Sequence, residues 1–125
     1  MPGFILHFIA GNALFLIGSY GIQNYTQLEL TWKKQILLYG VCIGSSIIPD
    51  FPLALYFAFH LGSYDLLLQP HAQLHYIISP LAVILFIILS FIFPVKNKPI
   101  WIMGIFCILI HIIMDSLIQE TGIWI

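Results

Sequence analysis

This sequence has very few charged side chains. It contains no arginine, four lysines and five acidic residues, so that only 7% of its 125 residues are charged. Soluble domains have about 25% charged residues. A chain with so little charge cannot cover a water-soluble globule, and it lacks the basic surface of a nucleic-acid-binding protein. The composition therefore excludes an ordinary cytosolic enzyme, a disordered protein and a partner of nucleic acid.

Cysteines and recognisable catalytic motifs are also scarce. The two cysteines, Cys42 and Cys107, lie inside apolar runs, which predicts small core residues and argues against a disulfide framework. The chain contains no P-loop, no dinucleotide-binding fingerprint and no catalytic-serine motif. The common soluble nucleotide-binding and serine-hydrolase classes are therefore not indicated.

Apolar residues are abundant: they make up 61% of the chain, and the mean hydropathy is +1.03. A helix needs about 20 apolar residues to cross a bilayer, and four stretches have about that length, residues 4–22, 36–59, 75–93 and 100–118. We therefore expect an all-α integral membrane protein, a single domain of residues 1–125 built as a bundle of four transmembrane helices. Four short spans give a small core, so a homo-oligomer is compatible with this composition.

The four lysines predict how the chain lies in the membrane. Lys33 and Lys34 fall in the first connection between spans, and Lys96 and Lys98 fall in the third. The positive-inside rule places both connections in the cytoplasm. We therefore expect a multi-pass protein of the cell (inner) membrane with both termini on the non-cytoplasmic side. The first span lacks a basic leader and a clear cleavage site, so we expect it to be retained.

Six ionisable side chains stand inside apolar spans or at the mouth of one. An aspartate at the centre of a membrane helix costs about 2.5–3.5 kcal/mol on insertion scales, so such residues usually face an interior and serve a function. With the orientation given above, all six lie toward the non-cytoplasmic ends of their spans, although they come from four separate stretches of sequence. They are His7, Asp50, His71, His75, His111 and Asp115.

Local spacing brings some of these side chains closer together. His111 and Asp115 are four residues apart, so they share one helix face. His71 and His75 have the same spacing, and they share a face if a helix begins by Pro70, a residue that suits a first turn. Each pair is therefore predicted to point in one direction.

The sequence around Asp50 predicts a break in the second span. Pro49 and Pro52 stand on either side of it, and two prolines three residues apart are incompatible with a regular helix. Irregular backbone at membrane depth is tolerated only where it is buried in protein or lines a watery cavity. We therefore expect the Asp50 carboxylate to sit in loosened backbone of this kind.

Two aspartates and three or four histidines at one level are the ligand set of a divalent transition metal, most readily zinc. Imidazole and carboxylate both bind zinc at about 2.0–2.2 Å. Coordination returns on the order of 10 kcal/mol, more than the burial of these groups costs. Two alternatives use the same residues: a non-catalytic carrier of metal or protons, and a closed site that only holds helices together. His60, at a span end, is interpreted as an ordinary polar residue.

Four short motifs occur in order along the chain: Leu6-His7-Phe8, Ile48-Pro49-Asp50, His71-Ala72-Gln73-Leu74-His75 and His111-Ile112-Ile113-Met114-Asp115. This order resembles the YdjM-like family of membrane-bound, metal-dependent hydrolases, which is related to the zinc-dependent phospholipase C superfamily. The opening Met1-Pro2-Gly3-Phe4 is similar to the start of those phospholipases. The resemblance covers nearly the whole chain.

The resemblance implies a hydrolase that cleaves a phosphoester of a lipid or other membrane-associated substrate within the lipid bilayer. It implies Asp50 as a metal ligand or as a base for the attacking water, and Asp115 as a bridge to a second metal bound by His7. The ligands that it implies for the first zinc are Asp50, His75 or His71, His111 and Asp115. The later His-x-x-x-Glu pair of the wider group is missing, which predicts one or two metal ions rather than three.

Overall fold

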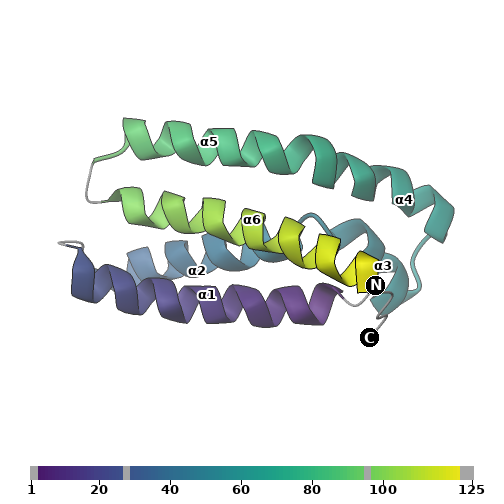
Figure 1. Ribbon diagram of the computed structural model, residues 1–125, viewed down its shortest axis with the longest axis horizontal. Helices are drawn as coiled ribbons and strands as arrows, with labels where there is room; N and C mark the ends of the chain where they lie inside the picture. Colours follow the sequence, from purple (N-terminus) through teal and green to yellow (C-terminus); the bar gives the residue numbers. More distant parts are fainter. Residues whose placement is uncertain (1–2, 27–28, 95–96, 122–125) are drawn as a thin grey trace.

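The computed structural model describes residues 3–26, 29–94 and 97–121, and these residues form helices joined by short connections. No strand occurs among them, so this part of the chain is all-helical, as predicted. The long helices run side by side, and two shorter ones lie where the chain turns at one end (Figure 1). In chain order the elements are α1 (Gly3–Tyr25), α2 (Trp32–Ile47), α3 (Phe51–Phe59), α4 (Tyr64–Gln73), the π-helical turn η1 (Leu74–Ile78), α5 (Ser79–Ile92) and α6 (Lys98–Thr121).

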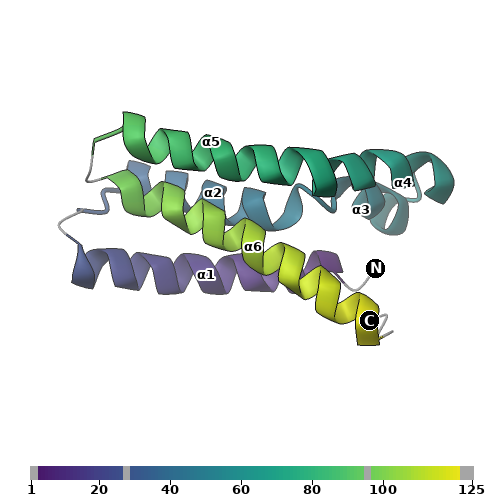
Figure 2. The ribbon, with the colours of Figure 1, turned by 45° about the horizontal axis from the view of Figure 1, so that its top comes forward.

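The last long helix, α6, is the centre of the packing. It lies against α1, α2 and α5, and α1 also packs along α2 (Figures 1 and 2). The core contains Leu38 and Cys42 from α2 together with Ile100 and Cys107 from α6, all fully or almost fully buried. Both cysteines are free thiols, which confirms that they are core residues and not part of a disulfide framework.

Three helical stretches are long and apolar enough to cross a membrane: Ile5–Tyr25, Leu66–Ile92 and Lys98–Leu117. Many leucine, isoleucine and aromatic side chains on them are exposed. A soluble monomer rarely exposes such extensive apolar surface. The exposed apolar surface and the three long apolar helical stretches are therefore typical of a membrane protein.

The second predicted span, residues 36–59, differs from the prediction because it is not one helix. It is divided between α2 and α3, and α2 has only 16 residues. At 1.5 Å per residue such a helix extends about 24 Å, short of the roughly 30 Å of a hydrocarbon core. Three of the four predicted spans therefore have the length and composition that a crossing requires.

The third long stretch begins earlier than the predicted residues 75–93. Ser63 precedes α4, and its side-chain oxygen accepts a hydrogen bond from the backbone N–H of Leu66 at 3.3 Å, which satisfies one of the free donors of the first turn. Pro70, expected in a first turn, lies inside α4. The helix therefore starts well before the two histidines that follow this proline.

The turn η1 interrupts the regular helix between α4 and α5, and the proline that follows it explains why. Pro80 has no N–H, and in a regular helix its ring would collide with the carbonyl of Tyr76, four residues earlier. The wider π turn is closed by Ser79, whose backbone N–H and hydroxyl both donate to the carbonyl of Leu74. Such turns are frequent at functional sites, and this one carries His75.

Candidate metal centre

All six ionisable residues singled out from the sequence come together at one end of the bundle. This is the end where α1 begins, α2 gives way to α3, α4 passes into η1, and α6 approaches its last turns (Figure 1). His60, interpreted as an ordinary residue, is an exposed residue in left-handed conformation (φ 52°) at the end of α3. The cluster, as we call it below, consists of His7, Asp50, His71, His75, His111 and Asp115.

Asp50 lies in the middle of the cluster. Residues 48–50 form a turn between α2 and α3, which confirms the predicted break. Asp50 occupies the N-cap position of α3, but its carboxylate makes no capping hydrogen bond. One oxygen, Oδ1, lies 3.2 Å from His75 Nε2 and 3.8 Å from His71 Nδ1, and the other, Oδ2, lies 3.4 Å from His7 Nε2. The side chain is only 3% exposed, so its charge is available to the histidines and withdrawn from solvent.

Asp115 closes the cluster from the side of α6. Its Oδ1 lies 2.8 Å from His7 Nε2, and its Oδ2 lies 3.3 Å from His111 Nε2 and 3.5 Å from His75 Nε2. The pair His111 and Asp115 thus shares a helix face, as their spacing predicts. Asp115 is the most exposed member of the cluster, with a side chain 24% exposed, and His71 follows at 20%. The cluster is therefore open to the outside beside these two side chains.

The orientation of His111 is fixed by backbone from another helix. Its Nδ1 lies 2.8 Å from the carbonyl oxygen of Ser46 in α2, and a carbonyl can only accept, so Nδ1 carries the proton and donates it. In the neutral ring Nε2 then carries a lone pair, and this atom is buried without a hydrogen-bond partner. It faces two carboxylates, with Asp115 Oδ2 at 3.3 Å and Asp50 Oδ1 at 4.0 Å. Lone pairs directed at carboxylate oxygens repel unless a proton or a cation lies between them.

Sequence reasoning missed the role of Ser46. The group that orients His111 is a main-chain carbonyl, and every residue has one, so no pattern of side chains in the sequence predicts this contact. A related signal is Gly11 on α1, since a Cβ there would lie only 3.0–3.1 Å from the Ser46 side chain. The lack of a side chain at Gly11 lets α1 approach α2 one turn beyond His7, and this close approach helps to bring three helices to the same point.

The donor atoms form two overlapping groups. His7, Asp50, His111 and Asp115 make the first and more buried group, and Asp50 joins His71 and His75 in the second; within each group the ligand atoms lie no more than 4.8 Å apart. Four ligands placed tetrahedrally at about 2.1 Å from one metal would be about 3.4 Å apart. The closer pairs of ligand atoms, 2.8–4.0 Å apart, lie on both sides of that value, and no pair within a group is more than 4.8 Å apart. Either group could therefore hold a metal ion after small adjustments.

The charge balance of the cluster also suits a cation. Among the residues that the structure describes, the lysines lie at the opposite end of the bundle, Lys33 and Lys34 at the start of α2 and Lys98 at the start of α6 (Figure 1). Lys96 lies outside the described residues. Within the described residues, the carboxylates of Asp50 and Asp115 thus have imidazoles as their only cationic neighbours. A single divalent cation would neutralise both.

Buried polar atoms without partners give a further test of whether a metal fits. Within the described residues these atoms include His111 Nε2, Asp50 Oδ2, His7 Nδ1 and His71 Nδ1. Burying such atoms unpaired is costly. The first two face the interior of the cluster, where coordination would satisfy them. The residues present therefore fit a metal ion of the kind that imidazole and carboxylate bind, although they do not identify the element.

No protein-family model, curated protein or solved structure matches this chain. The resemblance to membrane-bound, metal-dependent hydrolases rests on the order of the four motifs alone.

Proposed function

We propose that the chain is a membrane-embedded, metal-dependent hydrolase that cleaves a phosphoester of a lipid or other membrane-associated substrate. The observation that carries the proposal is the orientation of His111, whose Nδ1 is held by a carbonyl so that its Nε2 is directed at the carboxylates of Asp50 and Asp115. Metal-binding histidines are commonly oriented by such a bond from their other nitrogen. The order of the motifs supports hydrolysis as the chemistry.

Zinc is the metal we propose, in one or two ions. Zinc accepts imidazole nitrogen and carboxylate oxygen together, and catalytic zinc sites use three protein ligands and keep one position open. The more buried group offers four donors, and the second group offers three. Asp50 belongs to both groups, so it is the residue we propose as the bridge if two ions bind. The earlier interpretation, taken from the family resemblance, gave that place to Asp115.

We propose that α2 and α3 together make a fourth crossing, in which the break at Asp50 lies within the membrane-spanning part. Irregular backbone is tolerated there because it is buried in protein, and Asp50 is 2% exposed. The lysines at the far end of the bundle then belong to the cytoplasmic side under the positive-inside rule. The cluster would face the non-cytoplasmic side of the inner membrane.

A bound divalent metal supplies Lewis acidity toward a phosphoryl oxygen and makes a water molecule more acidic. The chain's own residues supply the rest. With a single ion bound through Oδ1, the other oxygen of Asp50, Oδ2, is buried and has no hydrogen-bond partner in the described part of the chain, so it can take a proton from an attacking water. His71, with a side chain 20% exposed at the edge of the cluster, can position the polar end of the substrate. The buried setting limits access of bulk water.

The lack of arginine limits the charge that a substrate can carry at the cluster. The chain contains no arginine. Among the residues that the structure describes, no side-chain cation other than an imidazole lies near enough to pair with a phosphoryl group at the cluster. A phosphodiester carries one negative charge fewer than the dianion of a phosphomonoester. We therefore propose a phosphodiester as the bond that is cleaved.

The first experiment is the metal content of the detergent-purified protein, measured by elemental mass spectrometry. We expect zinc in near-stoichiometric amount in the wild type and its loss in Asp115→Ala. His60→Ala is the matched control, because His60 is exposed at the end of α3 and lies outside the cluster. If wild type and Asp115→Ala both contain no metal after reconstitution with zinc, the proposal fails.

The second experiment separates a hydrolase from a carrier. The protein is reconstituted in vesicles of phosphatidylcholine and phosphatidylglycerol, and the lipids are analysed for diacylglycerol by mass spectrometry. We expect diacylglycerol with the wild type and none with Asp50→Asn. Zinc uptake into the vesicles without any lipid cleavage would instead establish the carrier.

A further inference from the structure

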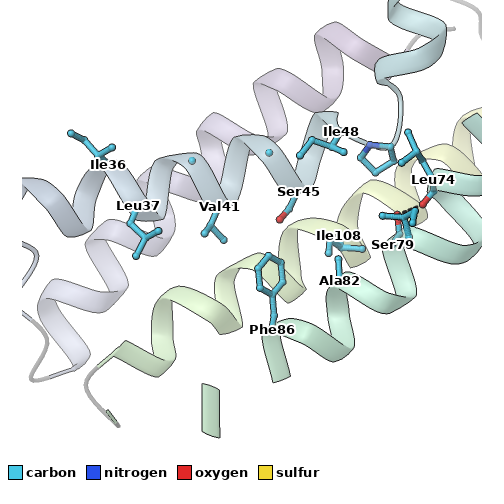
Figure 3. Close-up of a pocket in the computed structure, with 14 residues that line it drawn as sticks. Ile36, Leu37, Val41, Ser45, Ile48, Leu74, Ser79, Ala82, Phe86 and Ile108 are labelled. Carbon is cyan, nitrogen blue, oxygen red and sulfur yellow. Dashed lines mark hydrogen bonds between the residues drawn. The ribbon is translucent and has the colours of Figure 1, made fainter. Parts of the chain in front are cut away.

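An apolar groove runs along the bundle between α2 and α5. It has a volume of about 540 Å³, and α6 forms its floor through Ile108. Figure 3 shows side chains of α2 and α5 facing each other across this space. Its lining is almost entirely hydrocarbon. The lining residues that matter below are Gly40, Gly44 and Pro49 on the side of α2, and Leu74, Ser79 and Phe86 on the side of α5.

The groove exists because α2 and α5 both pack on α6 but hardly on each other. Gly104 allows this arrangement: a Cβ at that position would lie 2.6 Å from Phe86 on one side and 2.8 Å from Val41 on the other. On α2 the positions that could fill the space are Gly40 and Gly44, and a Cβ at Gly40 would meet nothing within 4 Å. The groove is therefore open because these two positions of α2 have no side chains to fill it.

One end of the groove lies beside the cluster, although no member of the cluster is among its lining residues. Pro49 lines the groove and precedes Asp50, and Leu74 lines it and precedes His75. The one polar group on this part of the α5 wall, the hydroxyl of Ser79, is engaged with the carbonyl of Leu74 at 2.8 Å. Apart from this hydroxyl and that of Ser45 on α2, the lining side chains of the groove are apolar.

We propose that this groove holds one hydrocarbon chain of a bilayer lipid and presents the headgroup of that lipid to the cluster. The second half of this proposal rests on the proposed function, because it makes the lipid the substrate. The first half stands on the groove alone. The chemistry that recognises the ligand is an unbranched, apolar chain along α2 and α5, ending in a polar phosphoester.

The length of the groove matches such a chain. From Ile36 to Ile48 the lining follows α2 for about 18 Å at 1.5 Å per residue. One leaflet of a bilayer has a hydrocarbon depth of about 15 Å, half of the full core. The groove also runs from beside the cluster toward the opposite end of the bundle, as far as Ile36 near the start of α2. A lipid of the leaflet nearest the cluster would lie in this direction, with its headgroup at the cluster.

The groove is too narrow to enclose a whole helix from a second copy. A volume of 540 Å³ spread over this length gives a cross-section of about 30 Å². Even the whole empty space of about 1050 Å³, its open side included, gives about 58 Å². A helix with side chains is 10–12 Å across and needs at least about 80 Å². A single hydrocarbon chain is the occupant that fits.

The test uses photo-crosslinking to a lipid. The full chain is reconstituted in vesicles of phosphatidylcholine and phosphatidylglycerol that contain a phosphatidylcholine with a diazirine in the middle of one acyl chain. Labelled peptides are located by mass spectrometry. We expect labelling concentrated on the groove residues of α2 and α5. In Gly40→Leu we expect this labelling to fall about tenfold, since excluding even two methylene groups accounts for a factor of that size.

The matched control is Gly21→Leu on α1, where a Cβ also meets nothing within 4 Å but which does not line the groove. It should label as the wild type does, and Gly44→Leu should repeat the result of Gly40→Leu. Equal labelling in Gly40→Leu and wild type would overturn the proposal, and so would labelling spread evenly over all exposed apolar faces. A crosslink between two copies through the groove would also overturn it.

Metal content measured on the same samples keeps the two proposals apart. Zinc without groove labelling removes the lipid site and leaves the metal centre. Groove labelling without zinc removes the hydrolase and leaves a lipid-binding groove. Gly40→Leu should retain its zinc, because the substitution lies outside the cluster and its side chain enters open space.

Discussion

His111 donates a hydrogen bond from Nδ1 to the backbone carbonyl of Ser46 at 2.8 Å, and this bond joins α6 to α2 beside the buried carboxylate of Asp50. It fixes which nitrogen of the ring faces the cluster. It also means that the position of α2 relative to α6 decides how well the cluster can bind an ion. Substitutions that move either helix should therefore change metal affinity without touching a ligand.

Gly11→Leu tests this coupling. A Cβ at Gly11 would lie 3.0–3.2 Å from atoms of Ser46 and Ile43, so a leucine must push α1 away from α2. We expect the free energy of unfolding to fall by about 1–3 kcal/mol, as for other overpacked sites, together with weaker zinc binding. Thermal unfolding in detergent and zinc titration measure the two effects. Gly21→Leu on the same helix should change neither.

His111→Ala and Asp115→Ala should lose metal together. The two side chains lie on one face of α6 with Nε2 and Oδ2 3.3 Å apart, so each is expected to ligate the same ion. Loss of an outer hydrogen-bond partner typically costs about 10–100-fold in metal affinity, and loss of a ligand should cost more. Equal zinc content in these variants and in His60→Ala would contradict the site as described.

Asp50→Asn should reduce zinc binding more than His71→Ala does. Asp50 belongs to both ligand groups, whereas His71 belongs only to the less buried one, where its Nδ1 is 3.8 Å from Asp50. We expect Asp50→Asn to bind almost no zinc and His71→Ala to keep the ion of the more buried group. The number of ions per chain, from elemental analysis, distinguishes the variants. Full zinc content in Asp50→Asn would show that this carboxylate is not a ligand.

Zinc affinity should fall as the pH is lowered. Histidine ligands bind metal only when neutral, so protons compete with the ion for each imidazole. This competition strengthens as the pH falls, because more protons are available to displace the ion. Each displaced proton then changes affinity by about tenfold per pH unit. Zinc titrations from pH 7.5 to 5, roughly the range in which histidine changes charge, would reveal the slope. An affinity independent of pH would argue against histidine ligands.

Much of the site was predictable because its members are costly in apolar surroundings. An aspartate between two prolines and a His-x-x-x-Asp pair in an apolar run stand out against leucine and isoleucine, and the structure brings Asp50, His111 and Asp115 together. The break in the second span was predictable for the same local reason, since proline cannot continue a helix there.

Other features depend on contacts between distant segments. The start of α4 was misplaced because Pro70 was interpreted as a first-turn residue, while the helix begins with the cap at Ser63. The carbonyl of Ser46 has no side-chain signature. The groove was not predicted either. It depends on Gly104, which allows α6 to pack closely against both α2 and α5. Periodicity describes one helix at a time and says little about the space between helices.

The π-helical turn Leu74–Ile78 sets the angular register between the histidines and the helix that follows. Each residue turns an α-helix by about 100°, so the wider turn rotates everything before it relative to α5. A deletion of one residue after His75 in this turn, within residues 76–78, would keep every ligand and nearly the same composition. It would nevertheless swing His71 and the segment before it away from the direction of Asp50. The chain is therefore more sensitive here to a change of length than to most changes of side chain.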